Sequence, residues 1–269
     1  MGILNVTPDS FAEAAPLADV AHAVAVALQM EADGADLLDI GGESTRPGAE
    51  AVSAAEERAR VLPVIRALAG RLRIPISIDT YKAEVAKAAL AEGALLVNDI
   101  SGLRYDPSLA GVTAESGAAL ILTHTRGRSK TMYQEAVYRD VVADVAAELE
   151  EAMAIATAAG VGLSALIVDP GVGFAKQAAH SYGVLARLAD LASALDRPLL
   201  VGPSRKSFLR DAVGGRPPAE RDWGTAAAVT AAVLAGAHVV RVHAVAAMAQ
   251  VVRVAEEIRR HADGTDATG

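Results

Sequence analysis

Short apolar segments recur along the whole chain and alternate with longer stretches that have helical periodicity. Each segment has about four residues and is rich in Val, Ile and Leu, without clean alternation of apolar and polar positions. Such segments are typical of parallel strands buried on both faces. Eight of them are present, at residues 3–6, 37–40, 76–78, 95–97, 119–122, 166–168, 199–201 and 239–242.

The stretch between the fifth and sixth segments shows the clearest helical pattern. Apolar residues recur there at every fourth position, at Val141, Val145, Leu149 and Met153. The other side of this helix would carry acidic residues, namely Asp140, Asp144, Glu148 and Glu151. The pattern predicts an outer helix whose acidic face is turned to solvent.

The order of these elements predicts the fold class. A Gly-Ala pair precedes four of the segments, as expected where a helix ends at a glycine and the chain turns into the next strand. Eight strand–helix units in strict alternation imply a parallel sheet, and a closed (β/α)8 TIM barrel fits them best. An open doubly wound sheet is the alternative. We expect one α/β domain over residues 1–261 and a disordered tail at 262–269.

Composition narrows the functional classes. The chain has 269 residues, a formal net charge of −8 and no cysteine. The absence of cysteine excludes disulfides, thiolate metal sites and cysteine nucleophiles. The acidic balance argues against nucleic acid as a partner. No run is apolar enough to cross a membrane, and Met1 is not followed by a leader, so the expected location is the cytoplasm.

Polar residues gather where the predicted strands end. One Asp or Asn stands at this position after five of the strands, at Asn5, Asp39, Asp79, Asn98 and Asp169. Any single one could be a helix cap or a turn residue. In a barrel, however, all five would converge on one pocket at the carboxyl ends of the strands. Such a group could bind a flat heterocycle rich in N–H donors, hold a metal, or act as acid and base.

Basic residues fall on the same strand-end loops. They are Arg46, Lys176, Arg205, Lys206, Arg241 and His243. Arg241 and His243 occupy alternate positions after the eighth strand, so both can face the pocket as an anion clamp. His124 is a further candidate at a strand end. No P-loop, no His-Glu-x-x-His and no Gly-x-Ser-x-Gly occurs, which argues against an NTPase, a zinc hydrolase and a serine hydrolase acting through Ser204.

Several of these segments together resemble the dihydropteroate synthase family, and the likeness runs in order through residues 1–260. The matching stretches are Met-Gly-Ile-Leu-Asn-Val-Thr-Pro-Asp-Ser-Phe at 1–11, Asp-Ile-Gly-Gly-Glu-Ser-Thr-Arg-Pro-Gly at 39–48, Ile-Asp-Thr at 78–80, Asn-Asp at 98–99, Asp-Pro-Gly-Val-Gly-Phe at 169–174 with Lys176, Gly-Pro-Ser-Arg-Lys-Ser-Phe at 202–208, and Arg-Val-His at 241–243. The resemblance implies a TIM barrel, in agreement with the strand pattern.

The resemblance also implies a reaction and a division of the site. The reaction joins 6-hydroxymethyl-7,8-dihydropterin diphosphate to p-aminobenzoate and releases diphosphate. The pterin would be held by Asp79, Asn98, Asp169 and Lys206, with Asp39 organising the second strand-end loop and contacting the pterin region. The diphosphate would be bound by Asn5, Arg46, Arg241 and His243, with Mg2+ near Asn5. The p-aminobenzoate site would be shaped by Thr45, Pro47, Phe174, Ser204 and Lys206, and Gly202 would complete the substrate-binding set.

Two partner predictions and two rival functions come with this interpretation. We expect inhibition by sulfonamides, because the motifs around Phe174 and Ser204 have the ordinary form, and we expect a homodimer, as is usual in the family. A pterin-binding methyltransferase domain is one rival, although it would have no need of the Ser-Thr-Arg-Pro-Gly loop. A non-catalytic paralogue that only binds is the other, and its support is an altered first loop at residues 12–15. Further departures are Thr123 and Thr125 in place of methionine, Ala175 in place of glycine and Ala244 in place of aspartate.

Overall fold

The computed structural model describes residues 1–6, 16–44, 48–128 and 131–262. Its six-stranded parallel sheet follows the chain order β1-β2-β3-β4-β5-β6, and a parallel pair joins β7 to β8. All eight predicted strands are confirmed, with boundaries shifted by one or two residues. They are β1 (Gly2–Asn5), β2 (Leu38–Gly41), β3 (Ile76–Asp79), β4 (Leu96–Asp99), β5 (Ala119–Thr123), β6 (Leu166–Asp169), β7 (Leu200–Val201) and β8 (Val239–Val240).

Backbone bridges close the two sheets into one barrel. Val168 of β6 pairs with Leu199 just before β7, and Gly2 of β1 pairs with Val242 just after β8. At the second junction the Ile3 amide donates to the Val242 carbonyl at 3.0 Å, and the Val242 amide donates to the Met1 carbonyl at 2.9 Å. The structure therefore confirms the closed (β/α)8 barrel and not the open sheet.

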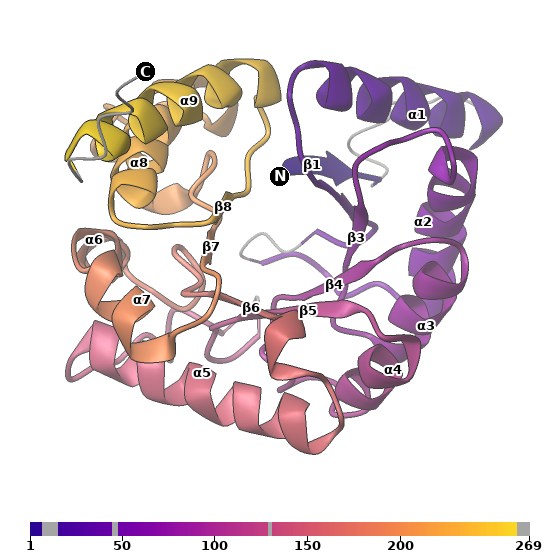
Figure 1. The fold of residues 1–269 in the computed structure, drawn as a ribbon, viewed down its shortest axis with the longest axis horizontal. Coiled ribbons are helices and arrows are strands. Elements are labelled where there is room, and N and C mark those ends of the chain that lie inside the picture. The colour runs from indigo at the N-terminus through magenta and orange to yellow at the C-terminus, as the bar shows by residue number, and fades with distance from the viewer. Residues whose placement is uncertain (7–15, 45–47, 129–130, 263–269) are drawn as a thin grey trace, which may run out of the picture.

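Helices surround the strands on all sides (Figure 1). None of the described helices is long and apolar enough to cross a lipid bilayer. The last helix extends through Ala262, one residue into the expected tail, whose remaining residues lie outside the described part. The α-helices are α1 (Pro16–Ala32), α2 (Ala54–Leu68), α3 (Ala83–Ala91), α4 (Leu109–Ser116), α5 (Val141–Ala158), α6 (Ala178–Ala186), α7 (Leu188–Leu195), α8 (Asp222–Leu234) and α9 (Val245–Ala262).

The apolar core has an outer layer and an inner one. The outer layer fills the space between strands and helices and includes Ile40, Ile78, Val97, Leu122 and Val168. The inner layer lies within the barrel and contains Met1, Leu96, Ile121 and Leu200, packed with Leu37, Ile167 and Val239. Successive strand residues point to opposite faces, so each strand contributes to both layers. The inner layer forms an apolar base beneath the carboxyl ends of the strands.

Helix α5 corrects one prediction. Its buried side is as expected, with Val145 and Leu149 in the outer core, and Asp140 caps it by accepting from the Val142 and Ala143 amides. Glu148 is not a solvated residue of the acidic face, however. Its carboxylate accepts from Arg104 at 2.6 Å and from Arg126 Nε at 2.9 Å. The strand-end loops therefore engage a residue that periodicity assigned to solvent.

Candidate active site

The strand-end residues form a polar layer directly above the inner apolar layer. In strand after strand, a residue that faces into the barrel is followed two positions later by a polar one on the same face. Leu96 is followed by Asn98, Ile167 by Asp169 and Val239 by Arg241. Ser77 and Asp79 continue the same alternation on β3, and Gly41 lies opposite Asp79 in the β2–β3 register. A side chain at Gly41 would meet the Asp79 Cβ at 3.4 Å, so the glycine leaves room for the carboxylate.

Arg241 joins two of the predicted pterin-binding carboxylates. Its Nε donates to Asp39 Oδ2 at 2.6 Å, and its Nη2 donates to Asp79 Oδ2 at 2.5 Å. Asn98 Nδ2 donates to the same Asp39 oxygen at 3.0 Å. The four side chains come from β2, β3, β4 and the end of β8, so residues separated by up to 202 positions form one hydrogen-bonded cluster. We call Asp39, Asp79, Asn98 and Arg241 the mouth cluster, because they lie at the carboxyl-end opening, or mouth, of the barrel.

Two acceptors in this cluster have no hydrogen-bond partner among the described residues. They are Asp39 Oδ1 and Asn98 Oδ1, and both residues are buried. Leaving a buried acceptor unpaired costs about 1–3 kcal/mol, so such atoms concentrate at sites that a ligand completes. The described partners of Asp39 are Arg241 and Asn98, and its predicted role in organising the second loop stays a prediction because residues 45–47 lie outside the described part.

Burial also disturbs the charges of the cluster. It raises the pKa of Asp79 to about 7, while Arg241 acts in the opposite direction and Asp39 adds to the rise. Burial opposes the charge of Arg241, yet the carboxylates of Asp39 and Asp79 raise its pKa above the ordinary value. The guanidinium is therefore permanently charged, and Asp79 is poised to change its protonation near neutral pH.

Asp169, Lys206 and Phe174 form the opposite wall of the mouth. Asp169 Oδ1 accepts from the Gly171 amide at 2.7 Å, and Lys206 Nζ donates to the Val172 carbonyl at 2.6 Å. The Lys206 ammonium lies 4.1 Å from the centroid of the Phe174 ring, in cation–π contact. Burial lowers the pKa of Lys206 to about 8 against the attraction of Asp169, and burial raises the pKa of Asp169.

Ser204 and His243 are hydrogen-bonded to each other, although the family resemblance assigned them to different substrates. Ser204 Oγ lies 2.9 Å from His243 Nδ1 and accepts from the His243 amide at 3.2 Å. Gly202 lies beside Arg241 and Lys206, and a Cβ there would come within 3.7 Å of the Arg241 Cβ and 3.8 Å of Lys206 Nζ. The predicted diphosphate and p-aminobenzoate residues therefore share one wall.

Asn5 ends β1 and is half-buried. Thr45, Arg46 and Pro47, also predicted for the site, lie outside the described residues. Within the described part of the chain, no group of three His, Asp or Glu side chains could enclose a metal. A lone carboxamide oxygen still fits Mg2+, which keeps much of its water and is often held by one or two protein ligands together with substrate phosphates.

A buried charge cluster at the start of the second loop was missed by the sequence analysis. The Lys82 ammonium forms ion pairs with Glu43 and Glu57, and Glu57 is only 1% exposed. Glu43 also accepts from Tyr81 Oη at 3.0 Å and from the Val52 amide at 3.3 Å. Two features of the sequence could have pointed to this cluster. They are Glu43 within the Gly-Gly-Glu motif and Lys82 three residues after the β3 carboxylate. This cluster connects the segments on either side of residues 45–47.

Two other basic candidates are placed away from the mouth cluster. Arg205 forms a bidentate ion pair with Asp222 of α8, at 2.7 and 2.8 Å. Lys176 is 1% exposed, and its Nζ lies 2.7 Å from His124 Nδ1. Burial lowers the pKa of Lys176 well below its ordinary value. Arg205 therefore stabilises a loop, whereas the Lys176–His124 pair lies behind the wall that carries Phe174.

Comparison with known proteins matches this geometry to a family. The family of pterin binding enzymes matches residues 1–243. A dihydropteroate synthase from Synechocystis is 46% identical over 260 residues, which cover 97% of this chain and 90% of that protein. The chain belongs to the dihydropteroate synthases of the pterin-binding family. The prediction of an enzyme of folate biosynthesis, a transferase with dihydropteroate synthase activity, is thereby confirmed.

Solved structures of dihydropteroate synthases share the whole architecture. A synthase from Clostridium difficile, determined in the presence of pteroic acid, superposes with a TM-score of 0.91 at 39% identity and covers 97% of this chain and 96% of its own. A Yersinia pestis synthase in a sulfonamide drug complex gives a TM-score of 0.90 at 40% identity, covering 96% of this chain and 93% of its own. The TIM barrel fold is therefore that of the family.

Proposed function

We propose that the mouth cluster of Asp39, Asp79, Asn98 and Arg241 is the pterin end of the synthase site. The observation that carries this proposal is the pair of buried, unpaired oxygens on Asp39 and Asn98. The edge of a pterin presents ring N–H and amino donors, which are the groups these acceptors lack. Asp169 on the opposite wall would complete the set, because its carboxylate is buried and faces the same opening.

The diphosphate would leave toward the cationic side of the mouth. Breaking the C–O bond leaves a cation at the pterin methylene, which the electron-rich dihydropterin stabilises. The main demand on the protein is to stabilise the departing anion, and we assign this to Arg46, Arg241 and His243. Arg241 also keeps Asp39 and Asp79 in place through its two hydrogen bonds. Bound near Asn5, Mg2+ would neutralise charge on the diphosphate.

The p-aminobenzoate would lie against Phe174, Ser204 and Lys206, with Thr45 and Pro47 on the second loop. An arylamine is neutral at pH 7, so no strong base is required, and positioning is the main contribution of this wall. The half-buried Lys206 ammonium suits the benzoate carboxylate or the pterin carbonyl. The sulfonamide bound to the Yersinia pestis relative supports our expectation that sulfonamides compete at this wall.

The direct test of this function is turnover. The protein is incubated with 6-hydroxymethyl-7,8-dihydropterin diphosphate, p-aminobenzoate and Mg2+, and dihydropteroate and diphosphate are both followed. We expect equimolar products, dependence on Mg2+ and inhibition by a sulfonamide that p-aminobenzoate relieves. Pterin binding without turnover would instead support the non-catalytic alternative. A cytoplasmic location stays a prediction from the sequence.

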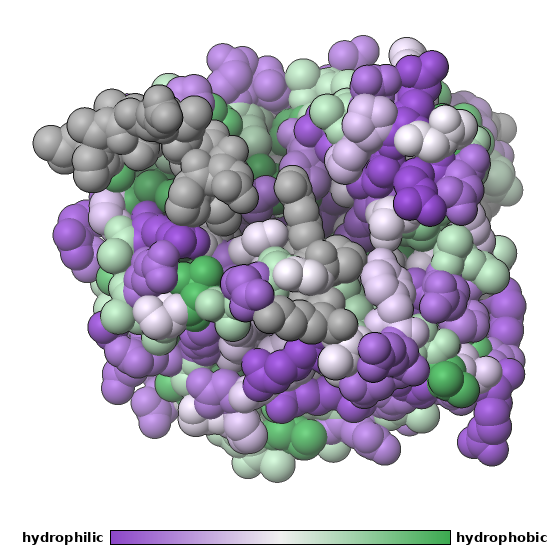
Figure 2. Space-filling view, turned by 180° about the vertical axis from the view of Figure 1, so that it is seen from behind, coloured by the Kyte–Doolittle hydropathy of each residue, from purple (hydrophilic) through white to green (hydrophobic). Residues whose placement is uncertain are grey.

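We further propose a homodimer through α8 and α9. The outer side of α8 is apolar along its whole length, at Trp223, Ala227, Ala231 and Leu234, with Trp223 89% exposed. Val254 and Ile258 of α9 are 61% and 51% exposed one turn apart. The face opposite to the view of Figure 1 is mostly hydrophilic, with only small separate apolar patches (Figure 2).

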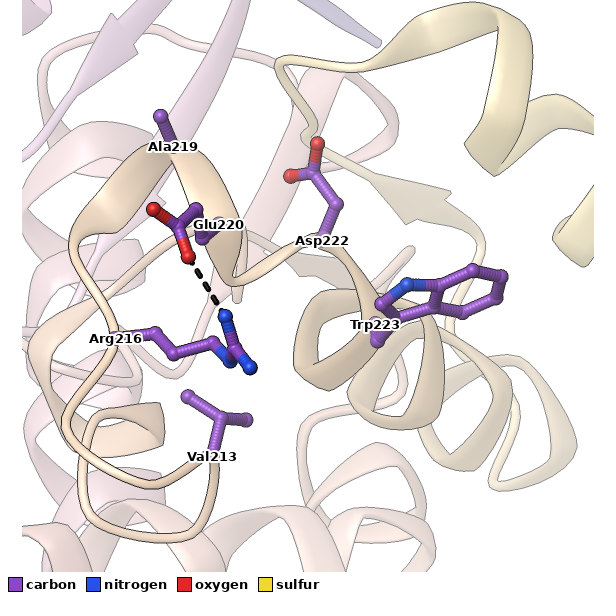
Figure 3. A pocket seen from close by; sticks show the side chains of 6 residues that line it. All are labelled: Val213, Arg216, Ala219, Glu220, Asp222 and Trp223. Atoms are coloured by element: carbon purple, nitrogen blue, oxygen red, sulfur yellow. Dashed lines mark hydrogen bonds and ion pairs between the residues drawn. The ribbon is translucent and has the colours of Figure 1, made fainter.

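The hollow beside Trp223 adds to this surface. It has a volume of about 520 Å³ and lies between the segment at Val213 and the start of α8. The indole extends outward from α8, while the Arg216–Glu220 ion pair lies within the hollow (Figure 3). Exposed apolar surface of this kind on a soluble enzyme usually marks an interface.

Analytical ultracentrifugation tests the dimer. We expect a dimer for the unchanged protein and a monomer for Trp223→Glu. The matched control is Leu163→Glu, because Leu163 is 49% exposed but lies on the short helix before β6. A Trp223→Glu protein that sediments like the unchanged one would place the interface elsewhere.

A further inference from the structure

Lys176 is a fully buried lysine to which the reaction assigns no task. It is 1% exposed and lies behind the strand-end layer. Its Nζ lies 2.7 Å from His124 Nδ1 and donates to the Phe174 carbonyl at 3.2 Å. Burying an ammonium is costly unless it is paired, and a methionine of similar volume would avoid the cost. A function for the buried amine and its two hydrogen bonds is therefore worth seeking.

A chain of polar contacts connects Lys176 to the outside of the barrel. His124 Nε2 lies 3.2 Å from Glu148 Oε2, and Glu148 is held by Arg104 and Arg126. Burial lowers the pKa of His124 to about 4, and the neighbouring Lys176 lowers it further, so the imidazole is neutral. Neutral His124 can accept from Lys176 through Nδ1, whereas its Nε2 lies near Glu148 without a hydrogen-bond partner among the described residues. The imidazole that contacts Lys176 thus lies beside Glu148 of helix α5.

The main chain that Lys176 contacts is held in an unusual conformation. Ala175 has a φ of +46°, in the left-handed region that side chains other than glycine rarely adopt. Side chains from a distant segment contact both the carbonyl and the amide of Ala175. The Tyr138 hydroxyl donates to the Ala175 carbonyl at 2.9 Å, and the Ala175 amide lies 3.5 Å from the Met132 sulfur. Together with Lys176, these contacts keep the turn in its strained form.

This turn sets the wall on which the proposed p-aminobenzoate site depends. Phe174 lies within it, with its ring 4.1 Å from the Lys206 ammonium. The Val172 carbonyl, two residues earlier, accepts from Lys206 Nζ at 2.6 Å. A change in the 174–175 peptide would therefore displace the aromatic ring that contacts Lys206.

We propose that Lys176, held by His124, is a positioning residue that orients Phe174 and Lys206 for p-aminobenzoate. Lys176 does not touch substrate and acts through the peptide of Phe174. The inference rests on the proposed assignment of Phe174 to the p-aminobenzoate wall. An alternative route would be electrostatic, through Asp169 and the pterin. Asp169 already faces Lys206 and Arg241, so its charge depends on Lys176 only in part.

The experiment is a kinetic double-mutant cycle on the whole enzyme with Lys176→Met, Phe174→Ala and the double variant. For Lys176→Met we expect the KM for p-aminobenzoate to rise about tenfold, since a small misplacement of a binding group costs that much or more, while the KM for the pterin substrate stays within about twofold. In the Phe174→Ala background, Lys176→Met should add little, because it acts through the ring already removed.

Controls separate positioning from stability and from the proposed site. Leu149→Ala creates a cavity on the buried side of helix α5, which carries Glu148, and should lower Tm without changing either KM. Tyr138→Phe removes only the hydroxyl that holds the Ala175 carbonyl, and should raise the KM for p-aminobenzoate in the same direction even if Lys176→Met does not fold. No effect of Phe174→Ala on this KM would refute the assignment of the wall itself.

Given an effect of Phe174→Ala, two results would overturn the role of Lys176. One is an increase confined to the KM for the pterin substrate, which would indicate the electrostatic route. The other is a full additional effect of Lys176→Met in the Phe174→Ala background, which would show that Lys176 acts independently of the ring.

Discussion

The two walls of the barrel mouth solve the problem of buried polarity in opposite ways. On the wall of β2, β3 and β4, Asp39 and Asn98 keep oxygens without partners, and Asp79 is close to its titration point at neutral pH. On the wall after β5, β6 and β7, Lys206 is hydrogen-bonded to Val172, and Lys176 to His124. The first wall is incomplete without a ligand, whereas the strand-end groups Asp169 and Lys206 of the second wall have partners within the protein. A buried nitrogen of this second wall that lacks a hydrogen bond to any described residue, His124 Nε2, lies behind them.

This contrast matches the chemistry of the two substrates. A pterin edge carries several donors in fixed directions, and unpaired acceptors recognise such an edge with high selectivity. A benzoate ring offers a flat face and one carboxylate, for which a rigid aromatic and a cation suffice. Under the proposed assignment of the walls, recognition of the pterin uses unpaired groups, while placement of the arylamine uses preorganised structure.

The largest effect is expected where the first wall meets the diphosphate. Arg241→Ala removes the cation that binds Asp39 and Asp79 and one of the groups assigned to the leaving anion. We expect kcat to fall by about 10²–10³, as for loss of a main transition-state contact, together with a lower Tm. Steady-state kinetics of diphosphate release measure the fall.

The matched control for that variant is Arg187→Ala, which breaks the exposed ion pair to Asp140 at 3.0 Å. It should leave kcat unchanged, since exposed pairs contribute little. A change confined to the KM for p-aminobenzoate in Arg241→Ala would contradict the assignment of this residue to the diphosphate.

An intermediate effect is expected for the unpaired acceptors. Asn98→Ala removes one of them and should weaken binding of the pterin substrate by about 1–3 kcal/mol, or roughly 5- to 150-fold. Titration calorimetry with the pterin diphosphate alone measures the loss. Ser77→Ala is the control, because the Ser77 hydroxyl is also buried and unpaired but lies one layer below, two residues before Asp79. Equal losses in both variants would contradict the contrast between the layers.

The smallest effect concerns stability and pH. An ordinary Asp has a pKa of about 3.9, while that of Asp79 is raised to about 7, so between these values the folded protein retains a proton that the unfolded chain has lost. The contribution of Asp79 to stability is therefore present at low pH and lost as the pH rises through 7. The quantity to compare is the Tm of Asp79→Asn minus the Tm of the unchanged protein. This difference should be more positive at pH 8 than at pH 5, by a few degrees in calorimetry. An equal difference at both values would contradict the raised pKa.

Much of this site was predictable because strands repeat simply. Residues two apart share a face, so the positions of Asn98, Asp169 and Arg241 above apolar residues follow from alternation once a barrel is assumed. Sequence spacing does not reveal pairing across the barrel. The contacts of Arg241 with Asp39 and of Ser204 with His243 depend on closure of the sheet, and the sequence analysis placed Ser204 and His243 with different substrates.

The supporting residues were harder to predict, for a different reason. Glu148 sits at a position that helical periodicity assigns to solvent, and only the loops above it show that it faces Arg126 and His124. Lys82 is marked only by its place three residues after the β3 carboxylate, and Tyr138 by no motif. Their roles come from contacts with Glu43 and with the Ala175 carbonyl. Residues that hold other residues in place depend on tertiary contacts that local patterns do not encode.

The most direct test of the division between the walls is a crossed kinetic measurement on Asn98→Ala and Phe174→Ala. Both KM values are determined for each variant, by product formation under saturation of the other substrate. The account predicts that Asn98→Ala raises the KM for the pterin diphosphate and Phe174→Ala raises that for p-aminobenzoate, with little effect on the other substrate in each case. An increase of the same KM by both variants would contradict it.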